Sequence, residues 1–351
     1  MNAVVFRGAG QIACEEVPYP DLPADGAILK VTACGICGGD LRAFKHGLRA
    51  DRDFQILGHE ISGVIAEVGP EVTDYKVGER IAVAADVSCG KCYYCKAGFY
   101  NLCENWKLLG LDYAGGMTDY MQLPAAILQD GIIHRIPETL SDRRSALAEP
   151  ASSVLWAQQS LNVQPGEVVV IIGDGPIGAL HVQVARLRGA KPIMVGVTGG
   201  RLDIFKNRDM GTWKVFDNNL TDVVADVRDL TEGRGADVAI VACPVKSAQA
   251  QAVEIVRKRG RVGLFGGLPK ADPITHLDSN RIHYNELSII GNFSYHPSMH
   301  QVALDLLDRG LIEADKIITA VYPLTEVQAA FQAAMDATEL KVVLAPNGSL
   351  D

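Results

Sequence analysis

The chain has 351 residues, a length that suggests about two domains. Hydrophobic residues make up 48% of it and charged residues 21%, so it can build globular cores and lacks the composition of a disordered protein. Its formal net charge of −9 argues against nucleic acid or an anionic membrane surface as a partner.

Targeting signals are not expected in this sequence. The N-terminus has no basic region followed by an apolar core, so we expect no signal peptide. No stretch of about eighteen apolar residues occurs, so we expect no membrane span. A reducing cytoplasm is the simplest location for a chain with 8 cysteines.

The first part of the chain predicts a β-rich domain. Up to about residue 150, short apolar runs alternate with turns that contain glycine and proline. Strands are predicted at 28–32, 61–68 and 80–83. We therefore expect a compact, mostly antiparallel domain.

A thiol, an imidazole and a carboxylate stand close together in this domain. Cys37 follows a predicted strand at 30–33, and His59 is followed directly by Glu60. These three groups can hold zinc and leave a position for a substrate oxygen. Cys34 and Cys37 could instead be a redox pair, but the thioredoxin-like βαβ context is missing and His59-Glu60 would then be unexplained.

Four further cysteines have the spacing Cys-x2-Cys-x2-Cys-x7-Cys. They are Cys89, Cys92, Cys95 and Cys103. This spacing is typical of a closed, tetrahedral structural zinc site. The alternatives are two disulfides or four unrelated thiols, and an intracellular location favours the metal.

After residue 150 the pattern changes to alternating strands and helices. Strands are predicted at 168–172, 192–197, 238–242, 260–265 and 287–291. Helices are predicted at 152–160, 179–187, 201–207 and 248–256, and later at 299–308 and 325–337 before a last strand at 341–344. Repeated units of this length predict an α/β fold with a doubly wound parallel sheet.

A glycine-rich segment follows the first of these strands. Gly173-x-Gly175-x-x-Gly178 lies between an apolar strand and a helix, which is the context that a dinucleotide pyrophosphate needs. The glycines permit a sharp turn, close approach of the phosphates and helix packing on the strand. An ordinary tight turn between strand and helix is the alternative.

The end of the next strand bears on the choice of cofactor. Folds that prefer NAD place an acid about 20 residues past the glycines, whereas Gly196 stands there in this chain. Thr198 and Arg201 could accommodate a 2′-phosphate, the arginine through a forked contact. The sequence therefore favours NADP over NAD. Alternatively, Arg201 only begins a solvated helix and the choice of cofactor is loose.

The Gly-His-Glu-x2-Gly-x5-Gly-x2-Val motif at 58–72 resembles the zinc signature of the medium-chain alcohol dehydrogenase superfamily. The cysteine motifs, the glycine-rich segment and their order are also similar, over essentially the whole chain, and most so to the sorbitol/threonine dehydrogenase-like branch. The resemblance implies a GroES-like β-rich catalytic domain at 1–152 and 291–351, with the zinc lobe at 89–103, and a Rossmann domain at 153–290.

The resemblance also implies roles for single residues around a catalytic zinc. It implies that Cys37 and His59 bind the metal. Glu60 and Glu149 stand where this branch keeps carboxylates that ligate zinc directly or through water. Asp40 stands where members of the family hydrogen-bond the ligating imidazole and fix its tautomer.

Cofactor contacts are expected from the glycine-rich segment and from residues that follow it. Phe265 lies in a segment similar to the loop that borders the nicotinamide. Lys341 resembles a basic residue near the pyrophosphate, although it could equally be a plain exposed lysine. The full set of expected cofactor residues is Gly173, Gly175, Pro176, Ile177, Gly178, Thr198, Arg201, Phe265, Phe293 and Lys341.

Three positions depart from the family pattern. Gly39 replaces the Ser or Thr that passes the alcohol proton outward in many relatives. Arg42 replaces a frequent histidine, and Ser294 replaces a basic residue of sorbitol-type enzymes. These changes leave zinc chemistry intact and put sorbitol itself in doubt as the substrate.

The sequence thus predicts a zinc-dependent NAD(P) oxidoreductase that interconverts a secondary alcohol, such as a polyol or sugar, and its ketone. An NADPH-dependent aldehyde or ketone reductase is the first alternative. A non-catalytic nucleotide-binding relative is the second, supported only by the hydroxyl missing at position 39. By resemblance we expect a homodimer or homotetramer with a small-molecule substrate.

Overall fold

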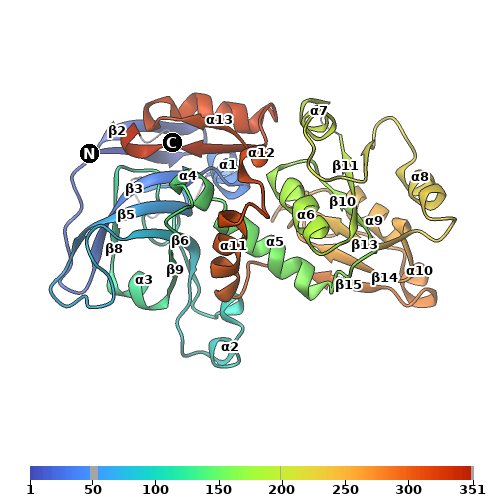
Figure 1. Cartoon of the computed structure of the whole chain (residues 1–351), viewed down its shortest axis with the longest axis horizontal. Coiled ribbons are helices and arrows are strands. Elements are labelled where there is room, and N and C mark those ends of the chain that lie inside the picture. Colours follow the sequence, from blue (N-terminus) through green and yellow to red (C-terminus); the bar gives the residue numbers. More distant parts are fainter. Residues whose placement is uncertain (48–53, 198, 349–351) are drawn as a thin grey trace. The chain divides into compact units, whose positions relative to one another are not determined.

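The computed structural model describes residues 1–47, 54–197 and 199–348. The chain forms two compact units (Figure 1). The β-rich unit comprises Met1–Ser152 and Tyr295–Asp351, and the parallel-sheet unit comprises Ser153–Ser294. Sequence analysis set the return to the first unit at residue 291, whereas the structure sets it at Tyr295.

Two sheets build the β-rich unit. A three-stranded sheet has the order β2-β1-β4, and an eight-stranded sheet has the order β16-β17-β3-β5-β6-β7, with β8 on β3 and β9 on β6. All these pairs are antiparallel except β16–β17. The strands are β1 (Asn2–Gly8), β2 (Gln11–Glu16), β3 (Ala27–Gly35), β4 (Gln55–Ile56), β5 (Glu60–Val68), β6 (Arg80–Val87), β7 (Lys107–Leu108), β8 (Tyr120–Leu123), β9 (Gly131–Arg135), β16 (Ile318–Tyr322) and β17 (Lys341–Leu344).

Helices from both ends of the chain complete this unit. Phe331 on α13 is fully buried and packs edge to face on Phe44 of α1, with ring centroids 5.5 Å apart. The core thus joins N-terminal and C-terminal segments by apolar burial, the dominant stabilising term in folding. The helices are α1 (Gly38–His46), α2 (Tyr93–Lys96), α3 (Ala125–Asp130), α4 (Asp142–Ser145), α5 (Ala148–Ser160, which runs into the other unit), α11 (Ser298–Asp308), α12 (Ala314–Ile317) and α13 (Val327–Met335).

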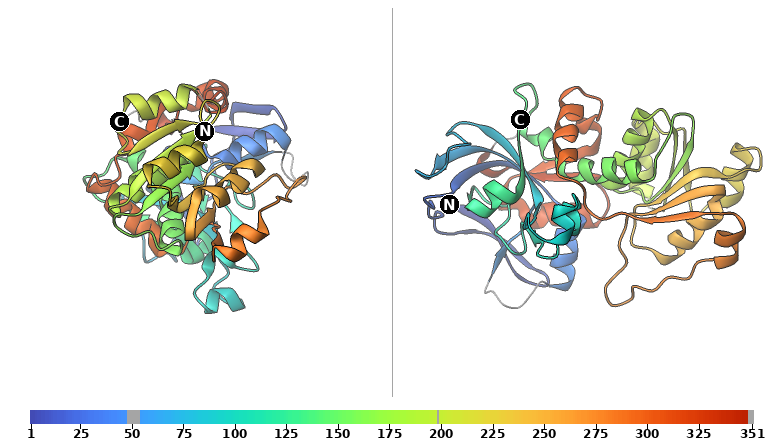
Figure 2. Two further views of the ribbon diagram at one scale, coloured as in Figure 1. Left: turned by 90° about the vertical axis from the view of Figure 1, so that its right-hand side faces the viewer. Right: turned by 90° about the horizontal axis from the view of Figure 1, so that it is seen from below.

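The parallel-sheet unit contains a six-stranded sheet in the order β12-β11-β10-β13-β14-β15. Every pair in it is parallel, and helices lie on both faces of the sheet (Figure 2). The chain starts in the middle at β10, moves outward, and then crosses to β13, so the strand order reverses between β10 and β13. Such folds bind ligands at the carboxyl ends of the strands beside this switch point.

The elements of this unit agree with the expected doubly wound pattern. The strands are β10 (Val168–Ile172), β11 (Lys191–Gly196), β12 (Lys214–Asp217), β13 (Ala236–Val241), β14 (Val256–Leu264) and β15 (Ser288–Gly291). The helices are α6 (Pro176–Leu187), α7 (Gly199–Asn207), α8 (Val223–Leu230), α9 (Lys246–Ile255) and α10 (Ser279–Tyr284).

Some bounds differ from the sequence-based predictions for physical reasons. The helix α6 begins at Pro176 rather than 179, because proline is well tolerated in the first turn of a helix. The helix α5 begins at Ala148 rather than 152, which brings Glu149 into its first turn. β12 and α8 were not predicted from the sequence. For β12 the reason is that it is a short strand with charged residues at both ends. Within the described ranges, no helix is both long and apolar enough to cross a membrane.

Two histidines join β9 to α11 inside the β-rich unit. The Nδ1 atoms of His134 and His300 lie 3.0 Å apart, so one ring donates a hydrogen bond and the other accepts it. Burial and, to a smaller extent, the neighbouring His134 lower the pKa of His300 to about 3. Burial also lowers the pKa of His134. Both rings are therefore neutral in the folded protein at neutral pH.

This pair predicts a loss of stability in acid. The unfolded chain binds a proton on His300 below about pH 6.5, whereas the folded chain does not until the pH nears 3, so the free energy of unfolding falls as the pH drops through this window. We expect His300→Asn to cost about 1–3 kcal/mol at pH 7.5. The variant should also lose less further stability than the wild type between pH 7.5 and 5.5, as measured by urea unfolding.

The exposed His46 at the end of α1 offers a matched control. His46→Asn should keep both the stability and its pH dependence. An unchanged pH dependence in His300→Asn would contradict the assignment.

Candidate functional site

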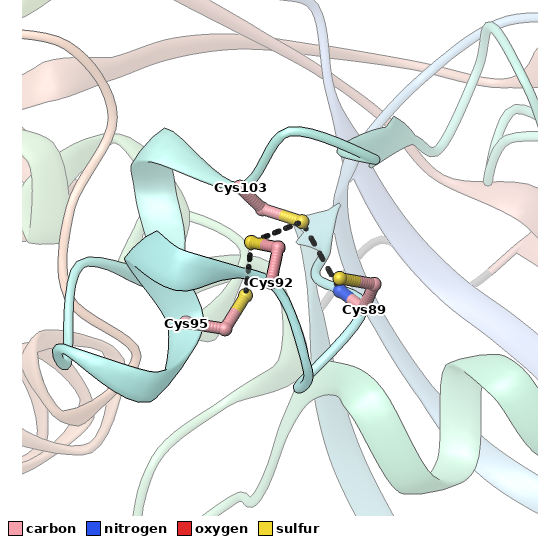
Figure 3. Close-up of side chains that lie close together, drawn as sticks. All are labelled: Cys89, Cys92, Cys95 and Cys103. Carbon is pink, nitrogen blue, oxygen red and sulfur yellow. Dashed lines mark hydrogen bonds between the residues drawn. The ribbon is translucent and has the colours of Figure 1, made fainter.

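The four cysteines of the predicted zinc lobe lie together. Their sulfur atoms are within 4.8 Å of one another, and Figure 3 shows the four side chains pointing toward a common centre. The Sγ of Cys92 is 3.5 Å from that of Cys95 and 4.0 Å from that of Cys103. Tetrahedral zinc at about 2.3 Å from each sulfur needs sulfur atoms about 3.8 Å apart. All 8 cysteines of the chain are free, so the disulfide alternative is not seen in the structure.

Backbone amides donate hydrogen bonds to the sulfur atoms of this lobe. The amides of Cys89 and Asn105 donate to the Sγ of Cys103 at 3.2 and 3.3 Å. Hydrogen bonds from the backbone amides of Lys91 and Cys92 lower the pKa of Cys89 to about 6. Such donors favour the thiolate, the form that ligates a metal. The arrangement fits a structural zinc ion.

The second candidate group is Cys37, His59 and Glu60. One ligand atom from each lies within 4.8 Å of the others. The pairing of β3 with β5 explains this, because Gly35 at the end of β3 stands opposite Glu60 at the start of β5. The sheet therefore brings together two segments that are distant in sequence.

Asp40 fixes the two loops that carry these ligands. Its carboxylate accepts hydrogen bonds from the amide of Cys37 at 2.8 Å and from the amide of Gly58 at 3.3 Å. The Nδ1 atom of His59 is 3.9 Å from Asp40 Oδ1, which is too far for a hydrogen bond. The expected hydrogen bond between Asp40 and the imidazole is therefore absent, and the two side chains interact only electrostatically.

The charges around His59 favour a cation at this place. Burial by itself would lower the pKa of His59, but the negative charges of Cys37 and Asp40 outweigh it and hold that pKa well above its ordinary value. The site thus concentrates anionic groups around one imidazole. Such a donor set fits a divalent metal.

Glu60 has a partner that the sequence did not predict. The ammonium of Lys341, at the start of β17, donates to Glu60 Oε1 at 2.6 Å and to the carbonyl of Ile36 at 2.9 Å. Both side chains are buried. Lys341 is therefore not the plain exposed lysine of the alternative, because its ammonium is buried and its charge is compensated by a carboxylate. Its place near the pyrophosphate stays a prediction.

The other oxygen of Glu60 is placed by a glycine. A Cβ atom at Gly35 would lie 1.9 Å from Glu60 Oε2, so only glycine leaves room for this carboxylate. Oε2 is buried and forms an ion pair with the Lys341 ammonium. The glycine and the lysine together fix this carboxylate beside Cys37 and His59.

Glu149 faces the same region from the first turn of α5. Burial raises the pKa of Glu149 to about 7, while interaction with His59 lowers it and Glu60 raises it. The hydroxyl of Tyr295 donates to Glu149 Oε1 at 3.3 Å. Glu149 is not part of the group within 4.8 Å, so three of the four predicted ligands are brought together there. Sequence reasoning missed Tyr295, which carries no motif.

The position of Gly39 has room for a small side chain beside the metal ligands. A Cβ atom there would lie 3.7 Å from His59 Cε1 and 3.8 Å from Cys37 Sγ. Nη2 of Arg42 borders the same space at 4.0 Å. A guanidinium thus stands near the place where many relatives carry a hydroxyl.

The glycine-rich loop has the geometry that a phosphate needs. Gly173 has a φ of 126°, and a Cβ at Gly178 would lie 1.9 Å from the carbonyl oxygen of Gly173. Gly175 caps α6 without a side-chain hydrogen bond, and Pro176 and Ile177 form the first turn. The first amides of α6 thus carry no side-chain cap, a typical phosphate-binding arrangement.

The remaining expected cofactor residues lie outside the glycine-rich loop. Arg201 is half-buried, and its Nη1 lies 3.7 Å from the place of a Cβ at Gly175. Phe265 packs on His181 with ring centroids 4.9 Å apart, and Phe293 is 56% exposed. Thr198 lies outside the described residues.

Comparisons with known proteins agree with this arrangement of sites. The family model "Alcohol dehydrogenase GroES-like domain" matches residues 23–134, and "Zinc-binding dehydrogenase" matches residues 176–309. A sorbitol dehydrogenase of Halalkalibacterium halodurans is 32% identical over 97% of both chains. D-arabitol-phosphate dehydrogenase of Enterococcus avium is 33% identical over 97% of this chain and 95% of its own.

A solved structure covers the same two units. A zinc-binding dehydrogenase of Sinorhizobium meliloti bound to NADP has a TM-score of 0.89 and 31% identity, over 98% of this chain and 99% of its own. Family models, full-length relatives and fold agree with the zinc and nucleotide motifs of the sequence. The chain therefore belongs to the zinc-dependent medium-chain alcohol dehydrogenase superfamily, in its sorbitol dehydrogenase-like branch, whose members are NAD(P)-dependent oxidoreductases.

Proposed function

We propose that this enzyme interconverts a secondary alcohol of a polyol or similar hydroxylated small molecule and the corresponding ketone. The observation that carries the proposal is the group of Cys37, His59 and Glu60, whose ligand atoms lie within 4.8 Å of one another. The names of the sorbitol and D-arabitol-phosphate dehydrogenases support a polyol as the substrate class.

Cys37 and His59 would hold the catalytic zinc, with Glu60 as the carboxylate ligand rather than Glu149, which is not part of the group within 4.8 Å. When bound, zinc polarises the substrate oxygen, and NAD(P) exchanges a hydride with the reacting carbon. Asp40 fixes the loops of the first two ligands, and Lys341 holds Glu60 in position.

The proton of the substrate hydroxyl needs an acceptor other than residue 39, because Gly39 has no side chain. We assign this role to Glu149, which interacts electrostatically with His59 and accepts a hydrogen bond from Tyr295. A positioned carboxylate is an ordinary general base.

Two other functions are compatible with the same fold. One is an NADPH-dependent aldehyde or ketone reductase, and the other is a nucleotide-binding protein without turnover. The hydroxyl missing at Gly39 is the feature in favour of the second. The metal-ligand group argues against it, because a protein that only binds nucleotide has no use for an open metal site.

A screen of polyols, sugars and simple alcohols with both nicotinamide cofactors tests the proposal. We expect oxidation of a polyol or related secondary alcohol, and reduction of the matching ketone, by zinc-loaded protein. Reduction of aldehydes with NADPH alone would favour the reductase, and nucleotide binding without any turnover would favour the non-catalytic protein.

Metal content provides an independent prediction. Purified protein should contain about two zinc ions per chain by elemental analysis. Cys103→Ser should remove the structural ion and lower the melting temperature, whereas Cys37→Ser should remove the catalytic ion and abolish turnover.

Cys14 lies on β2 outside both ligand groups, so Cys14→Ser is a matched control that should keep both ions and full activity. The site assignment fails if Cys37→Ser still turns over every substrate at the wild-type rate.

We also propose that the protein is a cytoplasmic homodimer or homotetramer. The outer strand β15 supports pairing of the parallel sheets between subunits, because it has a β-strand neighbour on one side only in the described sheet. A light-scattering mass of a single chain would refute this assembly.

A further inference from the structure

An acidic residue stands inside the glycine-rich loop. Asp174 lies between Gly173 and Gly175, in a loop whose amides suit the phosphates of the cofactor. A carboxylate at this place would repel a pyrophosphate if it pointed toward it. Its side chain is only 6% exposed, so the carboxylate must face the interior of the unit.

The carboxylate of Asp174 points to the end of the neighbouring strand. A Cβ atom at Gly196, the last residue of β11, would lie 2.5 Å from Asp174 Oδ2 and 2.6 Å from Asp174 Cβ. The parallel register of β10 and β11 explains this closeness, because Ile172 stands opposite Val195. Asp174 thus fills the space that the missing side chain of Gly196 leaves.

This space is the one from which an acid serves the cofactor in NAD-binding folds. An Asp or Glu about 20 residues past the glycines accepts the hydroxyls of the adenosine ribose. Residue 196 cannot hold one here, because any side chain would collide with Asp174. A carboxylate is nevertheless present at the same edge of the sheet, supplied by the loop instead of the strand.

Arg201 on α7 shares this region with Asp174. Burial lowers the pKa of Arg201, and the charge of Asp174 opposes that effect. The guanidinium is therefore already compensated by a carboxylate. A carboxylate has about four acceptor positions, more than a single arginine contact uses.

We propose that Asp174 accepts the hydroxyls of the adenosine ribose in place of a residue on β11, and that the enzyme therefore selects NAD(H) over NADP(H). The proposal rests on the nucleotide role of the glycine-rich loop, and it reverses the preference expected from Thr198 and Arg201. A 2′-phosphate would meet the negative charge of Asp174 and an arginine that already has a partner.

Binding constants test this without catalysis. Dissociation constants of NADH and NADPH are measured by nicotinamide fluorescence on the full-length, zinc-loaded protein, and those of ADP-ribose and its 2′-phosphate by calorimetry. The wild type should bind NADH and ADP-ribose more tightly than the phosphorylated forms. Asp174→Asn keeps the shape and removes the charge, so it should weaken NADH about 10-fold or more and leave NADPH equal or tighter.

Two further variants sharpen the test. In Asp174→Gly/Gly196→Asp the new carboxylate stands at the strand end, and removal of both the carboxylate and the Cβ of residue 174 makes room for it, so the preference for NADH should reappear. Asp203→Asn removes an equal charge from an exposed position on α7 and should leave the ratio of the constants unchanged.

The inference is overturned if the wild type binds NADPH more tightly, or if a folded Asp174→Asn changes both constants equally or neither. If the wild type binds no nucleotide at all, the nucleotide site itself fails, and the inference fails with it. Circular dichroism of each variant separates loss of binding from loss of folding.

Discussion

Buried negative charge is the constraint on which the catalytic region depends. Cys37, Asp40 and Glu149 gather around His59, and their charges outweigh the effect of burial and hold the pKa of that imidazole well above its ordinary value. Buried charges are tolerated only when they are paired or ligate a metal. Lys341 supplies one positive charge through a pair with Glu60, which lies 281 residues away in the chain. A divalent ion held by Cys37 and His59 would supply the rest.

The fold and the grouping of the candidate metal ligands were largely predictable from the sequence, because their signals are local. The spacing of the four cysteines and the apolar run at Val168–Ile172 each carry their meaning within a few residues. The pair of Lys341 with Glu60 was not predictable, since it arises where β17 packs beside β3. The same holds for Tyr295, which reaches Glu149 only in the folded chain.

The structure shows which side chains surround the positions that depart from the family pattern. Gly39 leaves space beside the ligands and Arg42 borders it, so the surroundings of the reacting group differ from those with a hydroxyl at this position. In the parallel-sheet unit, position 196 is a glycine, and the carboxylate of Asp174 lies in the space beside it. Position in the sequence does not show which side chain lies beside each of these glycines, because that depends on the folded chain.

The most direct measurement of the central claim is anomalous X-ray diffraction at the zinc absorption edge from crystals of the zinc-loaded protein. The account predicts two peaks per chain. One should lie among the sulfur atoms of the four-cysteine lobe, and the other should lie within bonding distance of Cys37 Sγ and a ring nitrogen of His59, with one coordination position open to solvent or substrate. A missing second peak, or a second ion closed off by four protein ligands in every state, would contradict it.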